Sequence, residues 1–362
     1  MRIALAGSKG VPGRHGVEVV VEELGARLAA LGHEVTVFAW EGYSTGAPLH
    51  RGCRVECTPG PCSGPLAMPL HAMRSFSRIV RRSGDFDLVH IHSVDPLMFA
   101  GRLEEDLPLV VTSHGRAYLA REAGLARRAM SRLAERRFLH SNARATAVAA
   151  HLVSYYEKSA PGKVVLVPNC LRNPGTRGNR VLADNGLQPG SYAVFAAGRL
   201  VPSKGLHTLL EAWLLAGIPL RLAVACPLLS GSYGRRIAAL TKEAGVVTTG
   251  LLEAPDLGDL LRGARFGVVP SKLEAQSMSL LDMLSCELTV VYSDIPGNRE
   301  IADGLGMPFE QESPESLALA LGEAVRAGPA LNEPARRRVA ALHDPDRVVK
   351  EYLEVYGKAL RG

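Results

Sequence analysis

Short apolar runs with strand-like composition alternate with helical patterns along nearly the whole of this 362-residue chain. Such alternation is typical of parallel α/β sheets, in which a helix returns the chain to the start of the next strand. We therefore expect an α/β fold built on parallel sheets. The predicted strands are residues 3–6, 34–39, 54–58, 88–92, 109–113, 145–149, 164–167, 193–197, 221–225, 246–249, 266–269 and 289–292.

The length of the chain favours two domains. Its 47% hydrophobic content is enough for two cores, and residues 172–190 are polar and rich in Gly, Asn and Pro, as linkers are. We expect one domain over residues 1–175, a second over 190–345, and a final amphipathic helix over 346–360. Ligands of doubly wound sheets bind at the carboxyl ends of strands, so functional residues should lie there.

Several protein classes are disfavoured. No apolar run approaches the roughly 18–20 residues of a membrane-spanning helix, and the opening MRIALAG reads as a strand rather than a signal peptide. We therefore expect a cytoplasmic protein. Three of the six cysteines, Cys53, Cys57 and Cys62, cluster without an evident fourth metal ligand. We interpret them as reduced thiols and expect no metal site.

Positive charge is concentrated in the first half of the chain. Residues 1–180 hold 24 Lys/Arg and 15 Asp/Glu, a balance of +9, whereas the remainder is at −3. Two arginine-rich helical stretches, 73–82 and 116–137, indicate either a solvated helix face or a surface for an anionic partner, such as acidic phospholipid or a phosphorylated acceptor. Aromatic residues make up only 5% and no nucleic-acid motif is present, so we expect no nucleic-acid partner.

Two loops that follow predicted strands are candidates for ligand binding. Residues 7–18, GSKGVPGRHGVE, are rich in glycine, but the spacing is neither that of nicotinamide-binding loops nor that of P-loop NTPases. The glycines of this first loop would let its backbone approach a ligand closely, although a plain turn fits this loop equally well. In the second loop, Arg199 and Lys204 flank the turn of GRLVPSKG, and two cations at a strand-to-helix turn suit a diphosphate. Alternatively, Ser203 caps the helix and Lys204 is merely solvated.

Two carboxylates, Glu274 and Asp282, lie eight residues apart in VPSKLEAQSMSLLD. With a helix starting near Gln276, Glu274 precedes the helix and Asp282 projects from its second turn, so both could reach a ligand at the helix N-terminus. A diphosphate would repel these carboxylates, whereas sugar hydroxyls would donate to them. Together with the two cations they fit a nucleotide sugar.

Histidines also occur near strand ends. His114, in VTSHG, is either a hydrogen-bond donor or base reaching into a cleft, or a structural residue. We expect His90 and His92 to face opposite sides of their strand, so that they cannot share a metal ion, and to be structural.

The motifs GRLVPSKG, VPSKLEAQSMSLLD and SDIPGNREI, after an opening GSKGVPGRHGVEVVVEELGARLAALGHEVTVF, resemble retaining glycosyltransferase family 4. The similarity is closest to bacterial rhamnosyltransferase-like members. It implies a GT-B fold: two Rossmann-like doubly wound domains that face each other across a cleft. The acceptor side would be the first domain, the nucleotide sugar would bind the second, and the last helix, about 346–362, would pack back on the first domain.

The resemblance also implies roles for individual residues. Arg199 and Lys204 would hold the donor diphosphate, and Glu274 would contact the sugar hydroxyls. The remaining implied contacts are Asp282 with the ribose, the Ser277 and Met278 backbone N–H groups with sugar or phosphate, Gly16 at the diphosphate, and His114 against the sugar.

Three departures from the family pattern stand out. Asp282 replaces a glutamate, which predicts looser or water-bridged ribose binding. His15-Gly16 replaces a pair of glycines, and Ala275-Gln276-Ser277 replaces Gly-Phe-Gly. These changes could adjust specificity or accommodate an unusual acceptor.

We therefore expect retaining transfer of a sugar from a nucleotide diphosphate sugar to a hydroxyl acceptor, in polysaccharide, glycolipid or secondary-metabolite synthesis. The cations would do the work of a metal, so neither metal nor cofactor is expected. The basic first half favours a lipid-phosphate-linked acceptor and peripheral contact with an anionic membrane. Two alternatives stay open: a nucleotide-sugar 2-epimerase on the same fold, and a catalytically degenerate nucleotide-sugar-binding subunit.

Overall fold

A computed structural model describes the chain except residues 62, 65, 120–123, 173–174, 228–230 and 329–331. Cys62, Arg121 and residues 173–174 of the predicted linker therefore lie outside the described residues. The chain divides into two compact units, each described here by itself. Unit 1 comprises Met1–Cys170 and His343–Gly362, and unit 2 comprises Leu171–Leu342.

Unit 1 is built on an eight-stranded sheet with the order β3-β4-β2-β1-β5-β6-β7-β8. All neighbouring strands are parallel except the pair β3 and β4. The strands are β1 Arg2–Ala6, β2 Glu34–Trp40, β3 Leu49–His50, β4 Cys53–Thr58, β5 Leu88–His92, β6 Leu109–Ser113, β7 Arg144–Ala147 and β8 Val164–Leu166. The helices are α1 Gly16–Ala30, α2 Ala67–Arg81, α3 Gly101–Asp106, α4 Leu125–His140, α5 Ala150–Glu157 and α14 Pro345–Leu360, with short 3-10 turns at Ser83–Asp85, Asp95–Phe99 and Ala117–Leu119.

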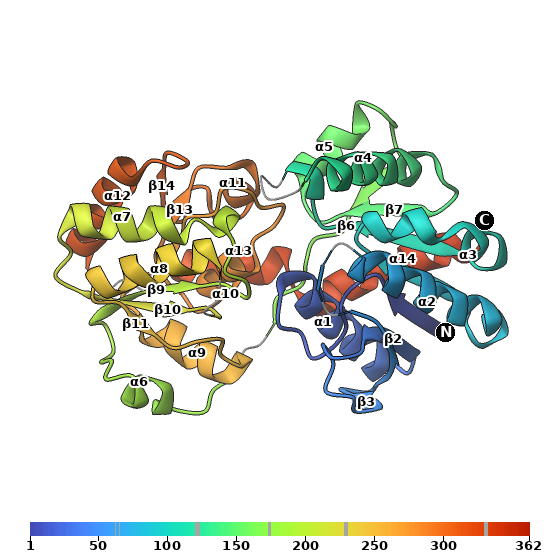
Figure 1. The fold of residues 1–362 in the computed structure, drawn as a ribbon, viewed down its shortest axis with the longest axis horizontal. Coiled ribbons are helices and arrows are strands. Elements are labelled where there is room, and N and C mark those ends of the chain that lie inside the picture. Colours follow the sequence, from blue (N-terminus) through green and yellow to red (C-terminus); the bar gives the residue numbers. More distant parts are fainter. Residues whose placement is uncertain (62, 65, 120–123, 173–174, 228–230, 329–331) are drawn as a thin grey trace. The chain divides into compact units, whose positions relative to one another are not determined.

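The C-terminal helix α14 belongs to unit 1, as do both chain termini (Figure 1). It begins sharply because the Asp344 side chain accepts a hydrogen bond from the Arg347 backbone N–H at 2.8 Å and Pro345 occupies the first turn. Its inner face, including Val348 and Tyr352, joins the core formed by β1, β2 and α1. The last residues of the chain therefore complete the core of the first unit.

Unit 2 contains a six-stranded, fully parallel sheet with the order β11-β10-β9-β12-β13-β14 (Figure 1). The strands are β9 Tyr192–Ala196, β10 Arg221–Ala225, β11 Val247–Thr248, β12 Phe266–Val269, β13 Val290–Ser293 and β14 Met307–Phe309. The helices are α6 Arg180–Asp184, α7 Leu206–Ala216, α8 Ser232–Glu243, α9 Ala254–Gly263, α10 Met278–Ser285, α11 Pro296–Ala302, α12 Pro314–Ala327 and α13 Glu333–Leu342, with a 3-10 turn at Pro202–Lys204.

Two hydrophobic cores cover the two faces of the unit 2 sheet. Alternate residues of β9 enter different cores: Tyr192 and Val194 pack with α9, α10 and α13, whereas Ala193 and Phe195 pack with α7 and α12. This follows from the two-residue period of a strand. Because both faces are covered, the strands read as continuous apolar runs, which makes them recognisable in the sequence.

The structure confirms the expected α/β fold with two Rossmann-like sheets and changes some boundaries. Helix α10 starts at Met278 rather than near Gln276, and α7 starts at Leu206, directly after the 3-10 turn Pro202–Lys204 and Gly205. The described helices include none with the length and apolar character that crossing a membrane requires.

Candidate functional site at the carboxyl edge of unit 2

The strand order of unit 2 reverses between β9 and β12, because successive strands are added on opposite sides of this pair. In doubly wound sheets, the loops at the carboxyl ends on either side of such a switch point diverge and leave room for a ligand. The two loops here are residues 197–205, between β9 and α7, and residues 270–277, between β12 and α10. They contain four of the eight residues expected to contact a donor: Arg199, Lys204, Glu274 and Ser277.

Lys204 and Glu274 are brought together at this edge. The lysine Nζ lies 2.5 Å from the glutamate Oε1, although the residues are 70 positions apart in the chain. Their side chains are 25% and 12% exposed, so the pair is accessible but largely enclosed. Gly205, which follows the lysine, has a φ of +72° and caps α7 in the left-handed conformation that glycine adopts without strain. Arg199 lies in the same loop and is exposed.

The N-terminus of α10 adds a positive electrostatic end to the site. Ser277 is the N-cap residue: its side chain is buried and accepts a hydrogen bond from the Leu280 backbone N–H at 3.3 Å. Met278 is the first helical residue and is partly exposed. The first N–H groups of a helix have no partner within it, so a ligand oxygen can accept from them.

Asp282 lies in the second turn of α10, as expected, but it is buried and ion-paired. Arg172 donates to it in a two-pronged contact, with Nε at 3.0 Å from Oδ1 and 3.1 Å from Oδ2 and with Nη2 bonded to Oδ2. The carboxylate is only 3% exposed. Arg172 has no local signal in the sequence, because it lies 110 residues from Asp282 in a segment with the composition of a linker.

In unit 1, His114 lies just after β6, at the carboxyl edge, and is half-buried. Its Nε2 is 3.1 Å from Nδ1 of His92. Burial lowers the pKa of His114 to about 4 and that of His90 to about 3, and it holds the pKa of His92 well below the usual value. All three imidazoles are therefore neutral at pH 7.

The expectation that His90 and His92 face opposite sides of their strand is wrong. Their ring centroids are 4.0 Å apart, because residues i and i+2 of a strand point to the same face. His90 is bonded through Nδ1 to the Tyr356 hydroxyl at 2.8 Å and through Nε2 to the Thr112 hydroxyl at 2.7 Å. His92 Nε2 is buried and has no hydrogen-bond partner among the described residues.

The glycine-rich first loop of unit 1 lies over the same edge. Gly16 is exposed and is the first residue of α1, with His15 as its N-cap residue. Two glutamates of α1 hold the loop: Glu18 accepts from the Lys9 backbone N–H at 3.1 Å and Glu22 from the Gly13 backbone N–H at 2.7 Å. These two hydrogen bonds fix the loop against α1, the helix that follows it.

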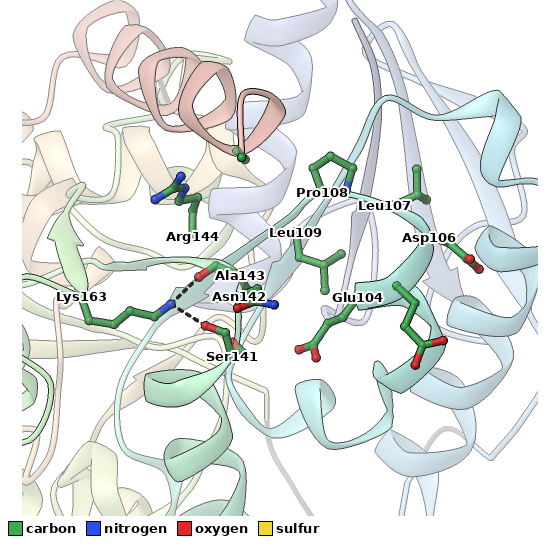
Figure 2. Close-up of a pocket in the computed structure, with 13 residues that line it drawn as sticks. Glu104, Asp106, Leu107, Pro108, Leu109, Ser141, Asn142, Ala143, Arg144 and Lys163 are labelled. Carbon is green, nitrogen blue, oxygen red and sulfur yellow. Dashed lines mark hydrogen bonds between the residues drawn. The ribbon is translucent and has the colours of Figure 1, made fainter.

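A cavity of about 640 Å³ lies at the opposite, amino edge of the unit 1 sheet (Figure 2). It is lined by the starts of β6 and β7, the end of α3 and the end of the chain. Lys163 lies along one side of it and donates to the Ser141 and Ala143 carbonyls at 2.6 and 2.8 Å, shown as dashed lines. None of the expected site residues lines this cavity. Its lysine already donates hydrogen bonds to two backbone carbonyls that directly follow α4.

The described cysteines carry no metal site. Cys53 and Cys57 are free, and burial raises the pKa of the Cys53 thiol to about 11. Across the described part of the chain, no group of three or more His, Cys, Asp or Glu side chains is placed to hold a metal ion.

Two family models match the chain. Residues 15–170 match the glycosyl transferase 4-like domain, and residues 191–326 match the glycosyl transferases group 1 domain. The chain is 27% identical over 288 residues to an uncharacterized glycosyltransferase, YqgM, of Bacillus subtilis (strain 168), covering 75% of this chain and 77% of that protein.

It is also 28% identical over 314 residues to a D-inositol 3-phosphate glycosyltransferase of Pseudarthrobacter chlorophenolicus, covering 78% of this chain and 74% of the relative. Among solved structures, Alr3699/HepE of Anabaena, in complex with UDP-glucose, is similar with a TM-score of 0.80. The identity is 17%, over 98% of this chain and 99% of that one.

Proposed function

The chain belongs to the group 1 glycosyltransferases of family 4, with the GT-B fold, and we propose that it transfers a sugar from a nucleotide diphosphate sugar to a hydroxyl acceptor with retention of anomeric configuration. The observation that carries this proposal is the Lys204–Glu274 pair beside the N-terminus of α10. A cation, a carboxylate and free helix N–H groups at one switch point offer partners to a diphosphate and to sugar hydroxyls at once.

In this proposal the two cations act on the leaving group. Negative charge grows on the diphosphate as the glycosidic bond breaks, and Lys204 and Arg199 would stabilise it. The donor phosphate would take the acceptor proton as it leaves, as the family resemblance implies. Glu274 would accept hydrogen bonds from the donor sugar, and its contact with Lys204 holds both side chains in place before the donor arrives.

UDP-sugars are the first donors to test, because the structurally similar HepE was solved with UDP-glucose. Asp282 can contribute to ribose binding while it is paired with Arg172, since each carboxylate oxygen has more than one acceptor position. The neutral His114 would donate or accept a hydrogen bond at the sugar rather than supply a positive charge. The resemblance to rhamnosyltransferase-like enzymes further suggests that the transferred sugar is rhamnose.

The acceptor side would be unit 1, and we infer peripheral contact with an anionic membrane through α4. Leu125 and Leu133 are 84% and 53% exposed and lie eight residues apart on one stripe of this helix. Arg132 and Arg136 are exposed beside them. Exposed leucines flanked by arginines suit the boundary between acyl chains and acidic headgroups, and a lipid-phosphate-linked acceptor would be found there.

The test begins with a thermal-shift screen of nucleotide sugars, in which a ligand at 100 times its Kd should add about 2.7 kcal/mol of stability. With the donor so found, turnover is compared in wild type, Lys204→Ala and Glu274→Ala. Loss of a charge-stabilising donor typically lowers kcat by about 10²–10³-fold, and we expect Lys204→Ala to fall in this range.

Arg336→Ala is the matched control, because Arg336 forms a cation–carboxylate pair of the same 2.5 Å length, with Glu287, in the same unit but outside both site loops. We expect its turnover to stay within a few-fold of wild type. Wild-type turnover in both Lys204→Ala and Glu274→Ala would refute the site. If the protein converts the nucleotide sugar into an epimer without any acceptor, it is an epimerase and the proposed sugar transfer is wrong.

A further inference from the structure

The loop that carries Glu274 rests on the first turn of the neighbouring helix α11. Gly297, the second residue of α11, is buried there, and a Cβ added to it would lie 2.3 Å from the Glu274 carbonyl oxygen and 2.7 Å from that of Ala275. Both obstacles are backbone atoms, which cannot swing aside as a side chain can. Even a methyl group at position 297 would therefore displace the segment that bears Glu274.

The same turn holds the start of the loop by hydrogen bonds. Asn298 is fully buried, and its Nδ2 donates to the Ser293 carbonyl oxygen and to the Ser293 Oγ, both at 3.0 Å. The Ser293 hydroxyl in turn donates to the Ser271 carbonyl, at the beginning of the loop. The β13–α11 turn therefore contacts the loop at residue 271 and again at residues 274–275.

On its other side, the loop is held by the β9–α7 loop. A Cβ at Gly205 would lie 1.9 Å from the Pro270 carbonyl oxygen, and the Lys272 backbone N–H donates to the Ser203 carbonyl at 2.8 Å. Strands β9, β12 and β13 are neighbours in the sheet, so the loops that follow them lie side by side at its carboxyl edge. Glu274 lies in the central loop of the three, between β12 and α10, and Lys204 lies in the adjacent loop, between β9 and α7.

We propose that Gly297 and Asn298 are positioning residues that set the place of the Glu274 carboxylate against the donor sugar. This proposal rests on the function proposed above, in which Glu274 accepts hydrogen bonds from sugar hydroxyls. An alanine at 297 must increase its separation from the Glu274 carbonyl by about 1 Å to reach ordinary van der Waals contact. A displacement of about 1 Å in a site is enough to cost up to about 10²-fold in rate.

The direct test is Gly297→Ala in the full chain, compared with Gly322→Ala. Gly322 also lies in a helix of unit 2, α12, but a Cβ there meets nothing closer than the end of the Arg326 side chain at 3.6 Å. Calorimetry with UDP and with UDP-glucose separates nucleotide contacts from sugar contacts. We expect Gly297→Ala to weaken UDP-glucose about tenfold or more and UDP by a clearly smaller factor, because UDP lacks the sugar that Glu274 would contact. Gly322→Ala should change neither.

If Gly297→Ala does not fold, a milder variant tests whether this turn positions Glu274. Ser293→Ala removes the hydroxyl between Asn298 and Ser271, and we expect a smaller loss of the same kind, confined to UDP-glucose. Ser191→Ala is its control, since Ser191 also donates to a carbonyl, that of Gln188, but precedes β9 at the far edge of the sheet. Equal losses for UDP and UDP-glucose, or no loss in a folded Gly297→Ala protein, would overturn the proposal.

A ligand-free measurement keeps this inference separate from the donor assignment. If the wild-type protein binds neither probe, the proposed UDP-sugar donor fails, and backbone amide NMR spectra then decide the role of Gly297. Changes in the amide signals of residues 203–205 and 271–277 in Gly297→Ala, absent in Gly322→Ala, would support it. Unchanged signals in this segment would refute it.

Discussion

Three histidines of unit 1, the buried His90 and His92 on β5 and the half-buried His114 just after β6, are expected to make the stability of this unit depend on pH. Burial lowers the pKa of His114 to about 4, against 6.5 for an exposed imidazole, and His90 and His92 are shifted in the same direction. The unfolded chain therefore binds more protons than the folded one below about pH 6.5. Each histidine lowers the free energy of unfolding by about 1.4 kcal/mol per pH unit as the pH falls from about 6.5 towards its folded pKa.

We predict that His114→Asn reduces this slope by about 1.4 kcal/mol per pH unit between pH 6.5 and pH 4, and leaves the slope above pH 7 unchanged. Urea unfolding at a series of pH values measures it. The two tryptophans allow each unit to be followed alone, since Trp40 is in unit 1 and Trp213 in unit 2. Trp40 in a Trp213→Phe background reports on unit 1.

His140→Asn is the control for this measurement, because His140 is exposed at the end of α4. Its slope should match that of the parent. A His114→Asn protein with the parental slope would show that the imidazole titrates normally in the folded chain.

At the scale of elements, α4 offers a test of membrane contact. Each arginine near an acidic surface contributes about 1 kcal/mol of binding, so reversing two charges should cost well over tenfold in affinity. We predict that Arg132→Glu with Arg136→Glu abolishes co-sedimentation with phosphatidylserine-containing vesicles at low salt. The matched control is Arg180→Glu with Arg326→Glu, which reverses two exposed arginines in unit 2. Equal binding by both double variants, or no binding by the wild type, would exclude α4 as the contact.

Most elements could be predicted because their signals are local. The runs 88–92, 109–113, 221–225 and 266–269 agree with β5, β6, β10 and β12 in both bounds, since buried parallel strands are continuously apolar. Strands β3 and β14 were missed, because β3 is only Leu49–His50 and β14 has a proline at its centre, which argues against a strand. The start of α10 was within reach of the sequence, because Ser277 is a favourable N-cap residue.

The residues of the candidate site also differ in whether the sequence alone could predict their position. Lys204 and Glu274 were predicted to lie at one edge because both follow parallel strands, and the structure places them in contact. Their ligands stay predictions. The Arg172–Asp282 pair and the packing of Gly297 on residues 274–275 depend on tertiary contacts between distant segments, for which the sequence has no local signal. These contacts can be known only from the folded chain.

At the scale of the whole molecule, the two units differ in how the chain completes them. Unit 2 is one continuous segment, Leu171–Leu342, whereas unit 1 needs the last twenty residues, His343–Gly362. Within these, Tyr352 and Tyr356 are almost fully buried. Their hydroxyls contact Thr112 at 3.3 Å and His90 at 2.8 Å. The integrity of the first sheet therefore depends on the end of the chain.

We predict that a chain ending at Leu342 loses the fold of unit 1 and keeps that of unit 2. A buried aromatic ring removes about 150–250 Å² from water, worth about 4–6 kcal/mol at 25 cal/mol per Å², and whole domains are stable by only about 5–15 kcal/mol. Losing two tyrosines together with Val348 and Val349 should exceed that margin. Unfolding followed by Trp40 should then show no transition, while Trp213 keeps a cooperative one. Removal of Arg361 and Gly362 alone, which are exposed, should change neither signal. A cooperative Trp40 transition in the chain ending at Leu342 would show that α14 is dispensable for the first unit.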